Sequence, residues 1–263
     1  MYFSAEAVFL APAVLLLGLA LRPRRARLAA LLAAVALIAA AFATRLQPFA
    51  LHTFLWAHLL QNVVLAEWAP GLLVLAVPSR LGSRVRIPPL VALPLWLVTY
   101  FLWHLPWSYD FALRHPHSLL HVEHVSYLFA GLCVWWPVVH GSHSAGAKAA
   151  YLFAAFVLAS PLGLLLALVP HPLYSVYAHA PRTWGPAPLA DQQIAGVTMA
   201  VEQAVVLFAV FAAYVLRFLR EEQLEGVYSR LSDSASFFGA ASSHESVRNS
   251  RASSGEASSR TSM

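Results

Sequence analysis

The sequence contains little charge and almost no sulfur. Charged side chains make up 11% of its 263 residues, whereas soluble globular chains carry about 25%. Cys133 is the single cysteine, which excludes an intramolecular disulfide, a CxxC motif and a thiolate cluster. The methionines are Met1, Met199 and Met263. A sulfur cage for Cu(I) is therefore not available, because it needs several thiolates or thioethers close together.

Apolar residues are abundant instead. Hydrophobic residues account for 59% of the chain, and the mean hydropathy is +0.64. These values exclude a disordered, collagen-like or coiled-coil protein and indicate a polytopic membrane protein. The net charge of +5 does not indicate nucleic acid as a partner, because the basic residues lie at the ends of apolar runs and form no continuous patch.

Seven apolar runs approach or reach the length of roughly 17–25 residues that a helix needs to cross a bilayer. The first lacks a basic leader and is followed by arginines, so we interpret it as a helix and not as a signal peptide. The sequence predicts an all-α, polytopic transmembrane bundle of about seven spans: 5–21, 28–46, 54–77, 87–104, 118–139, 149–170 and 193–217.

The basic residues predict the orientation of the bundle. Ten of them fall on one side, and three (Arg45, Arg114 and Arg182) fall on the other. Because cytoplasmic loops are enriched in Lys and Arg, we expect the N-terminus outside and the C-terminus in the cytoplasm. We divide the chain into a transmembrane domain, 1–228, and a Ser-rich cytoplasmic tail, 229–263, which we expect to be disordered. The ten are Arg22, Arg24, Arg25, Arg27, Arg80, Arg84, Arg86, Lys148, Arg217 and Arg220.

Histidines are concentrated at the predicted outer face. In "HSLLHVEHVSYLF", His117, His121 and His124 are spaced i, i+4, i+7 and form one helical stripe. Nine of the twelve histidines fall in outer loops or outer helix ends, which is more than scattered structural histidines would give. The nine are His52, His58, His104, His115, His117, His121, His124, His171 and His179.

Four of these histidines form the candidate metal site. His58 lies near the start of the third predicted span, His104 at the end of the fourth, and His121 and His124 near the start of the fifth. Three antiparallel neighbouring helices would bring these rings to one level, and imidazole is a common ligand of zinc, copper and iron. A nitrogen-rich site suits copper in either oxidation state, or zinc. His115, His171 and His179 fit ordinary interfacial residues.

Acidic residues inside the spans form a second candidate group. Glu67 and Glu202 fall near the middle of their spans, where ionisable residues are costly and often functional. They could equally be protonated or hydrogen-bonded packing residues. Asp191 fits an N-cap of the last span. Glu123, between two histidines, fits a residue that caps or orients a neighbour.

The aromatic residues follow the pattern of interfacial belts. We interpret them as belt residues and not as part of a cofactor site. Trp56, Trp103, Trp107, Tyr109, Tyr174 and Tyr177 are assigned to the outer belt, and Trp135 and Trp136 to the inner belt.

Several phrases together resemble the CtaG-type cytochrome c oxidase assembly factors of bacterial membranes. They are "HLLQNVVLAEWAPGLLVLAVP", "WHLPWSYDFAL", "LHVEHVSYLFAGLCVWWPV" and "PLYSVYAHAPRTWGPAPLADQQIAGVTM", in order over about residues 52–205. The resemblance implies a seven-helical, multi-pass protein of the bacterial plasma membrane that handles copper for a haem-copper oxidase, with oxidase subunits as partners. It implies no enzymatic activity and no catalytic residues.

The family pattern also maps onto particular residues. Its motif histidines would fall on His58, His104, His121 and His124, and its DQxxG segment on Asp191, Gln192 and Gly196. The chain departs from it at Asn62, where many relatives carry a second histidine.

Other classes of function stay open on the residues alone. In a membrane cytochrome, two histidines on facing helices would ligate haem. An intramembrane metal hydrolase would hold zinc with three histidines and an acid. The outer position of the histidines and the lack of a nucleophile or base beside them count against both. A metal transporter would use Glu67 and Glu202 along its path.

Overall fold

The computed structural model describes the backbone of residues 4–259 and the side chains of residues 4–228. Every regular element in that part is helical. The contacts divide the chain into two units, Met1–Tyr214 and Val215–Met263. The elements are η1 (Glu6–Leu10), α1 (Ala11–Ala20), α2 (Arg25–Phe42), α3 (Leu46–His52), α4 (Leu55–Val63), η2 (Val64–Trp68), α5 (Ala69–Ala76), α6 (Ser79–Gly82), α7 (Pro89–His104), α8 (Pro106–Arg114), α9 (Leu119–Val139), α10 (Ala145–Leu168), α11 (Ser175–Ala178) and α12 (Pro188–Ser259).

The prediction of an all-α transmembrane bundle is confirmed, but two of the seven predicted spans are short. Among the described residues, five helices are long and apolar enough to cross a bilayer, or six if the bent pair α7 and α8 is one span. The pair bends by 72° because Leu105 precedes Pro106 and takes an extended conformation, which ends α7. The first predicted span is the shorter apolar helix Glu6–Ala20.

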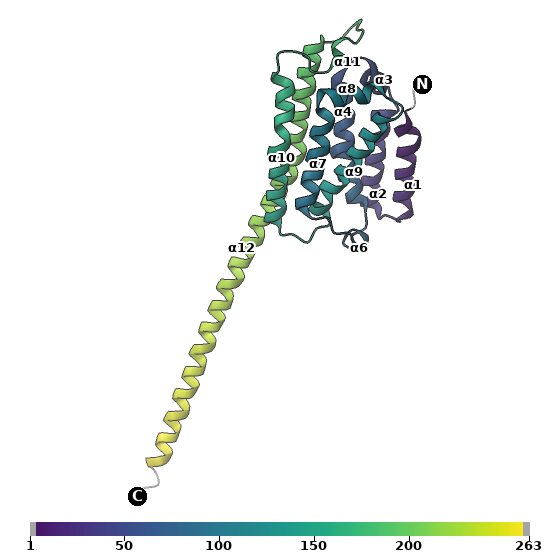
Figure 1. The fold of residues 1–263 in the computed structure, drawn as a ribbon. Helices are drawn as coiled ribbons and strands as arrows, with labels where there is room; N and C mark the ends of the chain where they lie inside the picture. The colour runs from purple at the N-terminus through teal and green to yellow at the C-terminus, as the bar shows by residue number, and fades with distance from the viewer. Residues whose placement is uncertain (1–3, 260–263) are drawn as a thin grey trace. The chain divides into compact units, whose positions relative to one another are not determined.

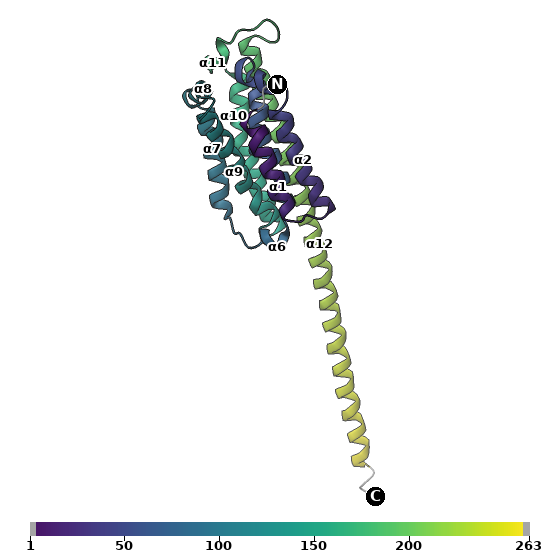
Figure 2. The ribbon, with the colours of Figure 1, turned by 90° about the vertical axis from the view of Figure 1, so that its right-hand side faces the viewer.

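In the first unit, α9 is the central helix. It packs against α5, η2 and α7, and α2 packs against α5. The short helices α3, α8 and α11 lie at one end of this unit, and α6 lies at the other (Figure 1). Figure 2 shows α1 and α2 side by side at the edge of the bundle, in agreement with their contacts.

A π-helical turn, η2, interrupts the third predicted span between α4 and α5. The wider turn leaves backbone carbonyls without their usual helical partners. Two buried indoles donate to carbonyls of this turn: Trp96 to that of Ala66 (3.2 Å) and Trp135 to that of Glu67 (2.9 Å). The assignment of Trp135 to the inner belt is therefore wrong, since its side chain is buried and holds this turn.

Gly196 allows α12 to approach α10 closely. A Cβ atom at this position would lie 2.6 Å from the carbonyl oxygen of Gly163 and 2.5 Å from the backbone nitrogen of Ala167. Because both contacts are with backbone atoms, a side chain there would push the helices apart. This explains the glycine of the DQxxG segment by packing.

The predicted tail, 229–263, has no described side chains. Its backbone continues α12 to Ser259, and residues 260–263 lie outside the described residues. A helix satisfies its own backbone hydrogen bonds and needs no packing partner for them. The boundary at 228 and the disorder of the tail stay predictions.

The orientation is also a prediction, and a fusion experiment tests it. A reporter attached after Ser229 should be active only if it is of the kind that works in the cytoplasm, because the basic residues cluster at the other membrane side from the histidines. Activity of an export-dependent reporter at this position would contradict the orientation. The short helix Glu6–Ala20 would then be the first candidate for a segment that does not cross.

Candidate metal site

The structure brings three of the four predicted histidines together and leaves the fourth at their edge. His58 on α4, His104 at the end of α7 and His124 on α9 are all buried. The ring centroids of His58 and His124 are 6.1 Å apart. Tyr109 on α8 lies against both His58 (5.0 Å) and His104 (6.1 Å), measured between ring centroids. His121 keeps 35% of its side chain exposed.

The hydrogen bonds of His58 define which of its nitrogens is free. Its Nδ1 lies 2.9 Å from the hydroxyl of Tyr177. That hydroxyl donates its single proton to the carbonyl of Ala50, so it accepts from His58, and Nδ1 carries the proton. Burial raises the pKa of Tyr177 well above its ordinary value, which keeps the hydroxyl protonated. With a single proton on the ring, the Nε2 of His58 presents a bare lone pair, and Oε1 of Glu123 lies 3.6 Å from it.

His104 reaches the same state by a different contact. Its Nδ1 lies 2.7 Å from the carbonyl oxygen of Tyr100, one turn earlier on α7. The hydroxyl of Tyr127 also lies 3.1 Å from this nitrogen. A carbonyl can only accept, so Nδ1 carries the proton, which the Tyr127 oxygen shares as a second acceptor, and Nε2 is bare. Tyr174 donates to the backbone carbonyl of His104 (3.0 Å), which fixes the end of the helix beside the ring.

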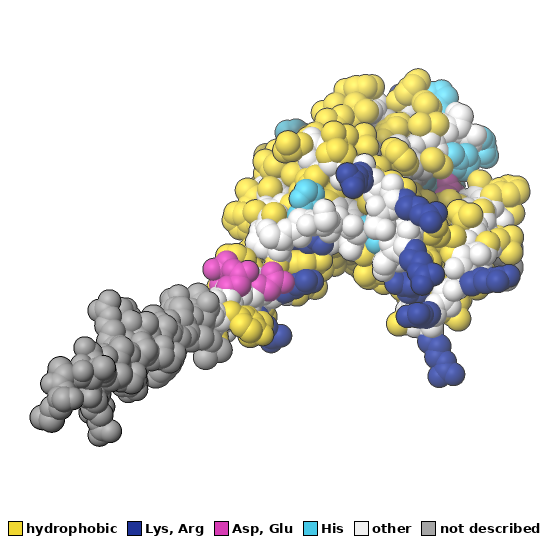
Figure 3. Space-filling view, turned by 90° about the horizontal axis from the view of Figure 1, so that it is seen from below, with side chains coloured by type: hydrophobic (Ala, Val, Ile, Leu, Met, Phe, Trp, Pro, Cys, Tyr) yellow, Lys and Arg dark blue, Asp and Glu magenta, His cyan; other side chains and the backbone are white. Residues whose placement is uncertain are grey.

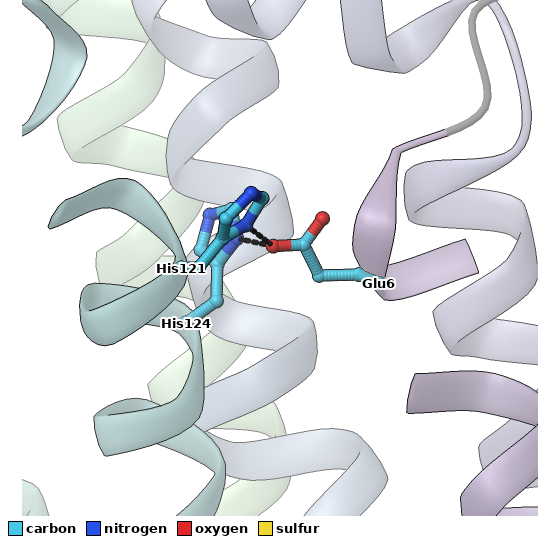
Figure 4. Close-up of side chains that lie close together, drawn as sticks. All are labelled: Glu6, His121 and His124. Atoms are coloured by element: carbon cyan, nitrogen blue, oxygen red, sulfur yellow. Dashed lines mark hydrogen bonds and ion pairs between the residues drawn. The ribbon is translucent and has the colours of Figure 1, made fainter. Parts of the chain in front are cut away.

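His124 shares a carboxylate oxygen with His121. The Nδ1 atoms of both rings lie 2.7 Å from Oε1 of Glu6, at the N-terminal end of the chain. Figure 4 shows the two rings on one turn of α9, and Glu6 reaching both of them from the facing helix η1. The carboxylate accepts, so both histidines carry the proton on Nδ1, and the Nε2 of His124 is bare.

Several buried nitrogen and oxygen atoms at this site have no hydrogen-bond partner. Three imidazole nitrogens, the Nε2 atoms of His58, His104 and His124, are buried with no hydrogen-bond partner in the structure. Leaving buried acceptors unpaired costs about 1–3 kcal/mol each. A cation could satisfy all of them only if the three rings moved closer together. The other unpartnered atoms beside them are Oε2 of Glu123, Oδ1 of Asn62 and the hydroxyl of Tyr109.

We call His58, His104, His124, Glu123, Asn62 and Tyr109 the inner cluster. Within it, Oε1 of Glu123 lies 3.6 Å from Nε2 of His58 and accepts from the amide of Asn62 (2.9 Å). Glu123 therefore contacts His58 on another helix, and its role as a residue that caps or orients a neighbour stays a prediction. Asn62 orients the acid through this hydrogen bond.

Glu6, His121 and His124 are the outer group. Among the described residues, this is the set of three whose ligand atoms all lie within 4.8 Å of one another. The nitrogens of the inner cluster lie farther apart, so the rings would have to close on an ion. His124 belongs to both sets: Nδ1 faces the outer group, and Nε2 is left for the inner cluster.

Sequence reasoning missed the residues that orient the histidines. Tyr109, Tyr174 and Tyr177 are buried beside the rings, so their assignment to an outer aromatic belt is wrong. Asp110 holds α11, and with it Tyr177, by accepting from the backbone N–H groups of Ser175 (3.0 Å) and Val176 (3.1 Å). Glu6 carried a usable signal, since it is an acid inside an apolar run.

Asp191 and Gln192 support the site from α12. The helix begins at Pro188, so Asp191 is not the N-cap that we predicted. Its carboxylate instead accepts from the backbone N–H groups of Leu55 (2.8 Å) and Trp56 (3.1 Å), the first residues of α4. Arg182 completes this buried contact at 2.9 Å. Gln192 accepts from the backbone N–H of Leu173 (2.7 Å) and so fixes the segment before α11.

Glu67 and Glu202 form a separate polar group deeper in the bundle. Gln203 donates to Glu67 (3.3 Å) and to the hydroxyl of Tyr100 (2.7 Å), and Trp68 donates to Glu202 (2.6 Å). Both carboxyls are buried and keep one oxygen without a partner. None of the hydrogen bonds described joins either acid to a histidine side chain.

The fold and the site together define a polytopic helical membrane protein with a buried histidine site. The sequence model of the cytochrome c oxidase caa3 assembly factors (Caa3_CtaG) matches residues 13–221, and the chain belongs to this family. The match confirms the resemblance seen in the sequence and includes the whole inner cluster, whereas Glu6 precedes it. Comparisons with curated proteins and with solved structures give no significant match.

Proposed function

We propose that this assembly factor binds one copper ion in the inner cluster and holds it for insertion into a cytochrome c oxidase. The observation that carries the proposal is the set of three bare, buried Nε2 lone pairs on His58, His104 and His124. Each is fixed by a separate hydrogen bond to its Nδ1. Metal-binding histidines have this arrangement, because the outer partner sets the tautomer and the direction of the ring.

The donor set favours copper over hard cations. Imidazole nitrogen suits copper, zinc and iron, whereas calcium and magnesium prefer oxygen. Among divalent first-row metals, copper binds most tightly to a given nitrogen site. Glu123 supplies a negative charge 3.6 Å from the Nε2 of His58. The family has the role of an assembly factor, which favours a non-catalytic use of the metal with oxidase subunits as partners.

The outer group fits an entry point for the metal. A surface hollow of about 250 Å³ is lined by His117, His121 and Ser4, among others. His121 is the half-exposed ligand of the outer group, and its neighbour His124 is buried. An ion captured by His121 and Glu6 would displace the proton that Nδ1 of His121 donates to Glu6, and it would then lie beside His124, which belongs to both sets.

Metal analysis of the full chain, purified in detergent, tests the proposal. After incubation with copper and removal of unbound ion, we expect about one copper per chain. The electron paramagnetic resonance spectrum of the Cu(II) form should show coupling to several nitrogens. A chain that retains no copper, or that prefers zinc at equal concentrations, would contradict the proposal.

Two further readings separate the alternatives. A Soret band in the purified protein would indicate the membrane cytochrome. Copper uptake into vesicles that is lost in Glu67→Gln and Glu202→Gln, with binding unchanged, would indicate a transporter.

A further inference from the structure

Four arginines surround a hollow at the opposite end of the first unit from the histidines. The hollow has a volume of about 390 Å³ and is lined by Arg22, Arg24, Arg27 and Arg80, together with Ser79. Figure 3 shows the Lys and Arg side chains gathered on this face. Arg27 donates to the hydroxyl of Ser79 at 2.9 Å. Within the described side chains, none of the four arginines forms an ion pair with a carboxylate.

The backbone adds to the positive potential of this arginine hollow. Arg24 is the N-cap of α2, an 18-residue helix, and no side chain caps it. The free N–H groups and the dipole of such an N-terminus attract anions. Arg22 has φ of +48°, in the left-handed region that residues other than glycine avoid. Strained backbone of this kind is concentrated at binding and catalytic sites.

An apolar cavity adjoins the arginine hollow. It has a volume of about 200 Å³ and lies between α1, α2, α5 and α9, lined by Val14, Leu17, Leu31 and Leu132 among others. Leu21 lines both spaces. An apolar cavity of about 150 Å³ already suffices to bind benzene. The second space can therefore take a segment of a hydrocarbon chain.

We propose that these two adjoining spaces bind one anionic phospholipid, with its phosphate in the arginine hollow and part of an acyl chain in the apolar cavity. Four unpaired guanidinium groups select against a zwitterionic lipid, whose cationic headgroup they repel. The apolar cavity selects against a free phosphate, which would leave it unused. Basic pockets between membrane helices bind anionic lipid headgroups in this way.

Native mass spectrometry of the full chain in detergent tests this site. We expect one phosphatidylglycerol to be retained, in preference to phosphatidylcholine with the same acyl chains. Inorganic phosphate and glycerol phosphate should not displace it. In Arg24→Gln/Arg80→Gln, the affinity for phosphatidylglycerol should fall by about 25-fold, at roughly fivefold per arginine.

The matched control is Arg84→Gln/Arg86→Gln. It removes the same charge from the same face, from residues that do not line the hollow, and should change the affinity less than threefold. If both double variants lost the same affinity for phosphatidylglycerol, the effect would come from general surface charge, and the proposed site would be wrong. Equal retention of the two lipids, or displacement by inorganic phosphate, would overturn it as well. The single variant Arg80→Gln should lose an intermediate amount of lipid affinity, and it provides the test if the double variant does not fold.

Discussion

Replacing His104 with alanine should abolish stable copper binding while the bundle still folds. The ring occupies the end of α7, and its Nε2 has no partner in the protein, so its removal deletes a metal ligand and one unpaired acceptor together. Loss of an outer-shell partner already costs about 10–100-fold in metal affinity. We expect a larger loss for His104→Ala, and similar losses for His58→Ala and His124→Ala, measured by copper titration of the purified proteins.

Two other histidines should affect copper affinity less than His104 does. His115→Ala should leave the affinity unchanged, because this exposed ring bonds only to its own helix, at the carbonyl of Phe111. His121→Ala should slow loading and weaken binding less than His124→Ala, since only His124 reaches the inner cluster. If the His104→Ala protein kept its copper, the inner cluster would not be the copper site. If it lost copper only because it unfolded, His104 would have a structural role alone. Thermal unfolding without metal distinguishes these cases.

The second large effect is expected at Asp191. The carboxylate is fully buried, accepts two backbone N–H groups of α4 and pairs with Arg182. Removing one member of a buried ion pair typically costs about 3–5 kcal/mol, because the remaining charge is left uncompensated. Asp191→Ala should therefore lower the unfolding temperature and the amount of protein in the membrane. Copper affinity should fall too, because the same N-terminus positions His58 three residues later.

Asp191→Asn provides the matched variant. It keeps an oxygen that can accept from α4 but loses the charge, so the cost should be closer to the roughly 1.5–3 kcal/mol of a hydrogen bond to a charged group. Glu221→Ala removes an exposed pair with Arg217 and should change stability by less than about 1 kcal/mol. An Asp191→Ala protein as stable as the Glu221→Ala protein would show that the cap of α4 is dispensable.

The location of the histidines could be predicted because it depends on local patterns. Runs of apolar residues place each helix, and the position of a histidine within a run gives its depth. His58 and His124 lie near the start of their helices, and His104 lies at the end of its helix. Neighbouring antiparallel helices bring a start and an end to the same side of the bundle. That reasoning placed all four rings at one end of the bundle, and the structure buries three of them there, with their role as ligands still a prediction. It could not separate His121, because both rings of the stripe face the same side of α9.

The belt assignment of the tyrosines failed for a related reason. Tyr109, Tyr174 and Tyr177 lie in short segments between the long helices, where an aromatic residue ordinarily meets the membrane interface. Here α8 and α11 fold back over the end of the bundle, and the phenol rings of Tyr109 and Tyr174 pack 4.2 Å apart between centroids. Burial of these segments depends on Asp110, whose hydrogen-bond partners lie 65 residues later.

The sequence by itself determined the class of the protein, the helical spans and the family, because hydropathy and motif order are properties of neighbouring residues. The tertiary structure decided which nitrogen of each histidine is free. The bond from Tyr177 to His58 joins residues 119 positions apart, and that from Glu6 to His124 joins residues 118 apart. A tautomer is set by the partner that accepts the ring proton, and partners so distant in the chain are brought together only when the helices pack.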